Sequence, residues 1–223
     1  MASFMDPEAP RRLAALRPHW DAAWADLGLS SPRDGLFAEV AGRYLEPHRA
    51  YHTLRHLEEC FALFGAARPL CAHPGEVQLA LWLHDAVYQP KARDSEEASA
   101  RWADKILRDA GAPSEVVARV QELILSTKHD ASPPAGDARV VVDIDLAVLG
   151  AEPARFNEYE AQVRKEYAHV PDVLFRFGRA KLLKQFLARS SIYSTPQFRE
   201  RFEARARANI AQSLARLTGG STC

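Results

Sequence analysis

The strongest constraint on the fold is an almost continuously apolar segment, VQLALWLHDAVY at residues 77–88. A helix that is apolar on every side is typical of the centre of a protein core. Two polar side chains, His84 and Asp85, interrupt this segment near its end. A buried carboxylate lowers stability by several kcal/mol unless it is paired or bound to a cation. We therefore predict a central helix over about 75–88 that brings a candidate metal ligand into the core.

The rest of the chain has apolar residues at helical spacing, separated mostly by Pro and Gly. We predict about ten helices and an all-α, single-domain helical bundle spanning residues 1–223. Besides the central helix, the predicted helices span residues 10–27, 32–45, 52–64, 94–111, 114–128, 138–149, 152–169, 172–189 and 195–217, with a loop at 130–136. The β-branched residues of 138–149 are also compatible with a strand. We interpret this segment as a helix because no other convincing strand exists to pair with it.

Length and charge limit the classes of function. A chain of 223 residues can bury a core without metal or disulfide support, so a metal site here is expected to be catalytic rather than structural. The 29 basic and 29 acidic residues give a formal net charge of zero. This balance argues against nucleic acid as the main partner, but a few local basic side chains can still bind a small anionic substrate.

Cysteine usage and hydropathy indicate the compartment. The three cysteines include no CxxC pair, which argues against a cysteine zinc site and favours a reducing compartment. The N-terminal segment lacks the apolar stretch of a signal peptide, and no stretch is long and apolar enough for a membrane span. We therefore expect a cytoplasmic protein without membrane contacts, and its oligomeric state is left open.

Two further histidine positions are candidates for the site. His52 and His56, in the segment YHTLRH, are four residues apart and share one face of the predicted helix over 52–64. His129 follows the predicted helix that ends at residue 128. A loop histidine of this kind either lies in solvent or lines a pocket.

Asp143 and Asp145 interrupt a second apolar run. On a helix, positions i and i+2 diverge by about 200°, so only one of the two faces the core. Asp145 shares its side with Val141 and Leu149, whereas Asp143 lies on a poorer and wetter side. We predict that Asp145 is the ligand. In a strand, by contrast, both carboxylates would point to the same face.

The predicted metal ligands are His56, His84, Asp85 and Asp145. Imidazole and carboxylate ligands without a thiolate suit Mn, Fe, Zn, Ni, Co or Mg. Four such ligands leave positions for water and a substrate oxygen, which distinguishes a catalytic site from a structural one. A divalent ion also lowers the pKa of its bound water toward neutrality. We place the metal-site core at about 48–150, with helices over 152–217 packing on it.

In their order along the chain, these four residues resemble the His…His-Asp…Asp signature of the HD superfamily, a group of all-helical metal-dependent hydrolases. The segment YHTLRH is also similar to the Tyr-His-Asn-X-X-His segment of cyclic-nucleotide phosphodiesterases. That resemblance implies that His52 is the general acid and His56 a metal ligand. The chain departs at Thr53, where that family has Asn, and it lacks the further His that follows the His-Asp pair there. The number of ions is therefore left open.

From about residue 52 to 209, the chain resembles a bacterial group of predicted HD-type phosphohydrolases. The segments that carry this resemblance are SEEASA at 95–100, TKH at 127–129, DIDLAVLG at 143–150, VRKEY at 163–167 and the region of Arg179. The resemblance implies hydrolysis of a phosphate ester or anhydride, on a nucleotide-like metabolite. Glu96, His129 and Arg179 are the candidate substrate contacts, although Glu96 is also explained as an acid at a helix N-terminus. The alternatives are a di-iron oxygenase of the same fold and a non-catalytic nucleotide sensor.

Overall fold

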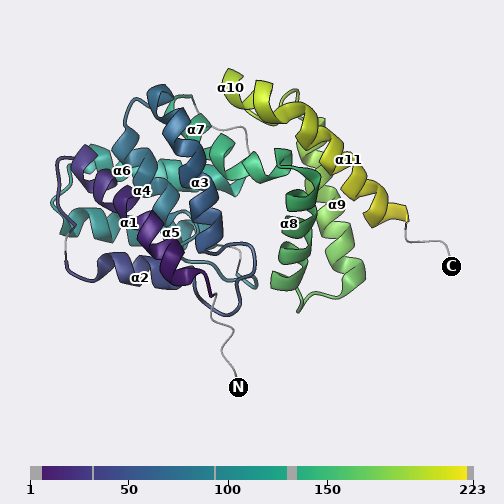
Figure 1. The fold of residues 1–223 in the computed structure, drawn as a ribbon, viewed down its shortest axis with the longest axis horizontal. Coiled ribbons are helices and arrows are strands. Elements are labelled where there is room, and N and C mark those ends of the chain that lie inside the picture. The colour runs from purple at the N-terminus through teal and green to yellow at the C-terminus, as the bar shows by residue number, and fades with distance from the viewer. Residues whose placement is uncertain (1–6, 32, 93, 130–134, 220–223) are drawn as a thin grey trace. The chain divides into compact units, whose positions relative to one another are not determined.

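The computed structural model describes residues 7–31, 33–92, 94–129 and 135–219. Every regular element within these ranges is helical, which confirms the all-α prediction (Figure 1). The chain forms two compact units, Met1–Ile144 and Asp145–Cys223. That both belong to a single domain, with helices over 152–217 packing on a metal-site core, stays a prediction. None of the helices described is long and apolar enough to cross a membrane.

The first unit contains seven α-helices within its described residues. These are α1 (Ala9–Asp26), α2 (Leu36–Arg43), α3 (Leu54–Ala67), α4 (Pro74–Leu83), α5 (Ser95–Asp109), α6 (Ser114–Leu125) and α7 (Asp137–Asp145). Short 3-10 turns, Arg68–Leu70 and Ser126–Lys128, extend α3 and α6. Pro32, the predicted first residue of the second helix, and residues 130–134 of the predicted loop lie outside the described residues.

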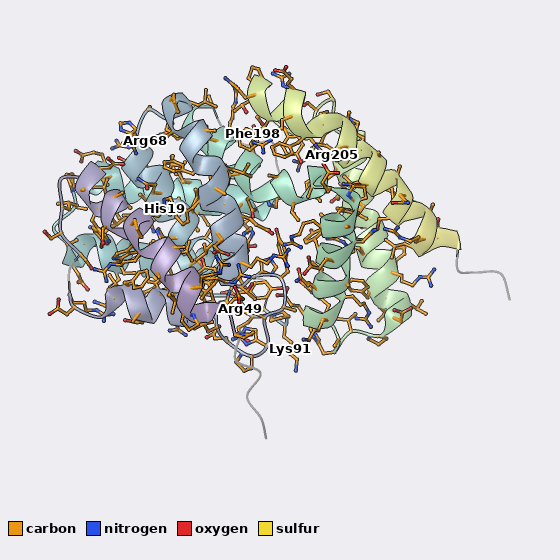
Figure 2. The ribbon with its side chains drawn as sticks, viewed as in Figure 1. His19, Arg49, Arg68, Lys91, Phe198 and Arg205 are labelled. Atoms are coloured by element: carbon orange, nitrogen blue, oxygen red, sulfur yellow. The ribbon has the colours of Figure 1, made fainter. Side chains whose placement is uncertain are left out.

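Helix α4 is the centre of this unit, as its apolar sequence predicts. Nine of its ten residues are buried, all but Pro74, and it packs against α1, α3, α5 and α6. Trp82 makes edge contacts with the aromatic rings of Trp20 and Phe37, and it also contacts Phe61. His19 of α1, which is labelled in Figure 2, stacks on the ring of Phe61, with 4.8 Å between the ring centroids. The buried carboxylate of Glu76 accepts two hydrogen bonds from Arg119, at 2.7 and 2.6 Å.

The beginnings of α4 and α7 are tied together. The carboxylate of Asp137, the first residue of α7, accepts the peptide N–H groups of Ala72 and His73, at 2.7 and 2.8 Å. These two amides directly precede α4, where helix geometry offers no internal partner. One side chain therefore anchors the starts of two helices whose far ends carry His84 and Asp145.

The helix ends nearest the candidate site differ from the prediction. Helix α3 begins at Leu54 and not at residue 52, because Thr53 is extended (φ −116°, ψ −179°). The prediction that His52 and His56 share a helix face was therefore wrong. Helix α4 ends at Leu83, so His84 and Asp85 follow the helix and do not lie inside it.

The second unit begins with a 3-10 turn, Leu146–Gly150, and continues with α8 (Pro153–Glu166) and α9 (Asp172–Ala188). The predicted last helix is present in three consecutive pieces, α10 (Pro196–Phe198), a π-helical turn (Arg199–Glu203) and α11 (Ala204–Gly219). Gly150 permits a close approach here, since a Cβ atom at this position would lie 2.6 Å from the Cβ of Phe202.

Candidate metal centre

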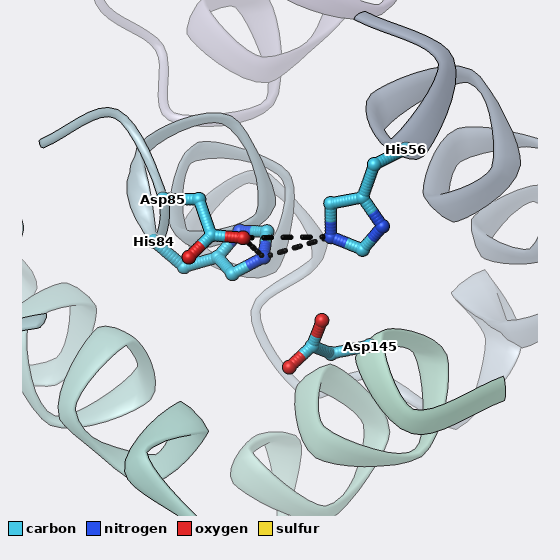
Figure 3. A group of neighbouring side chains, drawn as sticks. All are labelled: His56, His84, Asp85 and Asp145. Carbon is cyan, nitrogen blue, oxygen red and sulfur yellow. Dashed lines mark hydrogen bonds and ion pairs between the residues drawn. The ribbon is translucent and has the colours of Figure 1, made fainter. Parts of the chain in front are cut away.

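Four side chains converge on one point: His56, His84, Asp85 and Asp145 (Figure 3). Each offers one nitrogen or oxygen atom, and these atoms all lie within 4.8 Å of one another. Asp145 is the last residue of α7, and the rest of that helix belongs to the first unit. The group can hold a divalent metal ion, because two imidazoles and two carboxylates form a mixed nitrogen and oxygen donor set.

The spacing among the ligand atoms of His56, His84 and Asp85 fits a common ion. The Nε2 atoms of His56 and His84 are 3.2 Å apart, and the Nε2 of His84 is 3.1 Å from Oδ2 of Asp85. Two atoms bound about 2.1 Å from one ion, at tetrahedral or octahedral angles, lie roughly 3.0–3.4 Å from each other. The 3.6 Å between the Nε2 of His56 and Oδ2 of Asp85 requires a slightly wider angle.

A hydrogen bond orients the ring of His84 so that the lone pair of its Nε2 is available for a metal ion. Its Nδ1 lies 3.0 Å from the carbonyl oxygen of Leu81, which can only accept a hydrogen bond. In the neutral ring this places the proton on Nδ1 and leaves Nε2 unprotonated. A backbone carbonyl that fixes the tautomer in this way is a recurring feature of histidine metal ligands. The residue is 1% exposed, so its orientation is also restricted by packing.

Asp85 supplies negative charge in a largely buried position, with its side chain 15% exposed. Burial, and then the charge of Asp85, raises the pKa of Tyr44 well above its usual value. Partial burial raises the pKa of Glu96, and the charge of Asp85 adds to this effect. The field of this carboxylate therefore extends over its neighbours, and a bound cation would neutralise it.

The group includes Asp145 and not Asp143. The burial argument behind the choice of Asp145 was nevertheless wrong, because Asp143 is 0% exposed and Asp145 is only half-buried. Helix α7 is enclosed on both sides, with Val140, Val141 and Val142 all buried. The periodicity argument assumes that one face of the helix is exposed to solvent. At Asp143 this helix has no exposed face.

His52 lies beside the group but outside it. Its Nε2 is 3.9 Å from Oδ2 of Asp85, and its ring centroid is 4.2 Å from that of Tyr88. The side chain is 20% exposed, in contrast to the buried ligands His56 and His84. The structure therefore brings this histidine close to the site even though it is not helical.

The three candidate substrate contacts lie in different settings. Glu96 is in the first turn of α5, and His129 follows a 3-10 turn with a left-handed backbone (φ 57°). Arg179 lies in the second unit, where its buried guanidinium binds Glu160 and stacks on the ring of Tyr159. None of the three belongs to the metal-ligand group.

Sequence reasoning missed two residues at the site. The thiol of Cys60 lies 3.7 Å from the Nε2 of His56, one helical turn away. Arg49 donates hydrogen bonds to carbonyl groups of two segments at the site, among them the carbonyl of Asp85 at 2.7 Å. A single arginine in the segment EPHRAYH resembles an ordinary surface residue, so no pattern distinguishes it.

No protein-family model, curated protein or solved structure matches this chain. Membership of the HD superfamily therefore stays a prediction from the sequence motifs. The all-helical fold and the group of two histidines and two aspartates stand on the structure itself.

Proposed function

We propose that this chain is a metal-dependent phosphohydrolase that cleaves a phosphate ester or anhydride, with a nucleotide-like metabolite as substrate. The observation that carries the proposal is the convergence of two histidines and two aspartates beside a partly exposed third histidine, His52. A purely structural metal site has no need of an accessible proton donor at its edge.

The four ligands would hold the ion. Their protonation and charge favour its binding. His84 presents an unprotonated Nε2, and the two carboxylates contribute negative charge that favours a divalent cation. When bound, such an ion lowers the pKa of a coordinated water and polarises a phosphoryl oxygen. His56 and His84 exclude solvent from the inner side, because both are almost fully buried.

His52 is the proposed general acid, the role that its sequence resemblance implies. A general acid must reach the leaving oxygen, which lies beyond the ion and not on it. The position of His52 supports this role, because its imidazole is outside the ligand group and partly exposed, and its Nε2 is 3.9 Å from Oδ2 of Asp85. Protonation of the leaving oxygen by His52 would complete the cleavage.

Glu96 and His129 remain proposed substrate contacts. The charge of Asp85 acts on Glu96, which supports a position near the bound substrate. Arg179 also stays a proposal, but its guanidinium already binds Glu160. A phosphate contact by Arg179 would require this pair to open.

The decisive experiment is phosphate release by the purified chain from a panel of phosphomonoesters, phosphodiesters and nucleoside phosphates, each with Mn²⁺, Mg²⁺, Zn²⁺, Co²⁺, Ni²⁺ or Fe²⁺. His84→Ala should abolish activity, whereas His73→Ala, a histidine substitution at the other end of α4, should not. Oxygen consumption with Fe²⁺ and no phosphate release would indicate the oxygenase alternative. Nucleotide binding without any turnover would indicate a sensor, and either result would overturn the proposal.

A further inference from the structure

The side chain of Arg49, which is labelled in Figure 2, is buried, with 0% exposure, although arginine is rarely buried. Its guanidinium donates to the carbonyl oxygens of His52 (3.2 Å), Asp85 (2.7 Å) and Ala86 (3.2 Å). The remaining donors bind the carboxylate of Glu46, at 3.2 and 3.1 Å. These five bonds account for all five N–H groups of the guanidinium.

Two aromatic rings complete the surroundings of this cation. The guanidinium carbon lies 5.1 Å from the ring centroid of Tyr44 and 5.4 Å from that of Tyr88. The hydroxyl of Tyr44 donates to the carbonyl of Trp82 at 2.8 Å, so this ring is itself fixed to α4. Both rings favour a cation between them. Arg49 therefore has a defined position and cannot easily adopt another.

The three carbonyls belong to two of the three segments that supply the ligands of the site. His52 lies two residues before the start of α3, which carries His56, and Asp85 is itself a ligand. In the sequence, Asp85 is 36 residues away from Arg49. A metal site demands that ligand atoms from different segments keep their spacing within a few tenths of an ångström. A rigid planar fork that binds both segments at once provides such spacing.

We propose that Arg49 is a positioning residue, which sets the distance between the segment of His52–His56 and the turn of His84–Asp85 and thereby the metal affinity of the site. This inference rests on the metal centre of the proposed function. It does not depend on which reaction the bound ion serves.

The test is the dissociation constant for Co²⁺, measured by competition with a chelator, together with the visible absorption spectrum of the bound ion. Arg49→Lys keeps the charge but cannot reach three carbonyls. We expect this variant to bind Co²⁺ roughly 10–100-fold more weakly and with an altered spectrum, which is the usual effect of losing an outer partner of a metal site. Glu46→Gln, which removes only the orienting carboxylate, should weaken binding less.

Arg119→Met is the control, because it removes an arginine that binds a different glutamate, the buried Glu76, in the same unit and away from the site segments. It should lower the melting temperature but leave Co²⁺ affinity unchanged. Wild-type affinity in a folded Arg49→Lys would overturn the proposal. If that variant does not fold, wild-type affinity in Glu46→Gln would overturn it instead.

The outcome is separable from that of the proposed function. Wild-type protein that binds Co²⁺ but releases no phosphate from any substrate would refute the phosphohydrolase and leave the role of Arg49 standing. Wild-type protein that binds no metal would refute both.

Discussion

The Nδ1 of His84 lies 3.0 Å from the carbonyl oxygen of Leu81, within the last turn of α4. The helix that places this histidine in the core thus also decides which of its ring nitrogens can bind a metal ion. The same local geometry explains why a ligand is found where α4 ends. A carbonyl near a helix C-terminus has no internal partner and is available to accept the ring N–H.

Loss of any inner ligand should remove the metal. We expect the wild-type chain to bind about one divalent transition ion, and His56→Ala, His84→Ala and Asp85→Ala each to lose most of it. Elemental analysis after gel filtration measures the content directly. His73→Ala is the control, since its side chain is 49% exposed and lies outside the group. Full metal content in all three ligand variants would show that the ligand assignment is wrong.

The two aspartates of α7 should separate metal binding from stability. Asp145→Asn is expected to abolish metal binding with little change in the melting temperature of the metal-free protein, because Asp145 is only half-buried. Asp143→Asn should keep the metal but melt at lower temperature, because it alters a fully buried polar group. Equal metal loss in both variants would mean that Asp143 also reaches the ion.

His52→Ala should keep the metal and the fold but lose turnover by about 10²–10⁴-fold, the usual contribution of a general acid. The loss should be smallest for nitrophenyl phosphates, whose leaving group needs little protonation. Steady-state kinetics on good and poor leaving groups, with metal analysis of the same samples, tests this role. Metal loss in this variant would show that His52 is itself a ligand. Unchanged turnover on every substrate would show that His52 has no role in catalysis.

Glu203 should make the stability of the protein depend on acid pH. Partial burial alone would raise its pKa, but the peptide N–H groups of Ile192 and Tyr193 and the charge of Arg207 lower it below the ordinary 4.5. The carboxylate is therefore charged at lower pH in the folded state than in the unfolded state. Its contribution to stability is complete above about pH 4.5 and is lost as pH falls through the lower folded value.

The corresponding measurement is urea unfolding of wild type and Glu203→Gln between pH 7 and pH 3. We expect the variant to be less stable by about 1–3 kcal/mol at neutral pH, because charged hydrogen bonds are lost. This difference should shrink below pH 4.5. Glu200→Gln, at an exposed position of the same π-helical turn, should show no such trend. A difference that stays constant down to pH 3 would contradict the assigned cause.

The helices and the buried position of α4 were predictable, because apolar periodicity reports burial along a regular element. The helix ends at the site were not. His52 and Asp85 lie outside the helices, and their carbonyl groups accept hydrogen bonds from Arg49. A local sequence pattern cannot predict this partner. The burial of Asp143 was missed for a related reason, since enclosure of α7 on two sides depends on segments far away in the sequence.

The anchoring of two helices on Asp137 has a consequence for synthesis of the chain. A nascent polypeptide emerges with its N-terminus first, so the amides of Ala72 and His73 are made long before the carboxylate that binds them. The start of α4 therefore remains without this partner until residue 137 has left the ribosome. Eight residues later Asp145 follows, so the anchor and the last ligand reach the folding chain almost together.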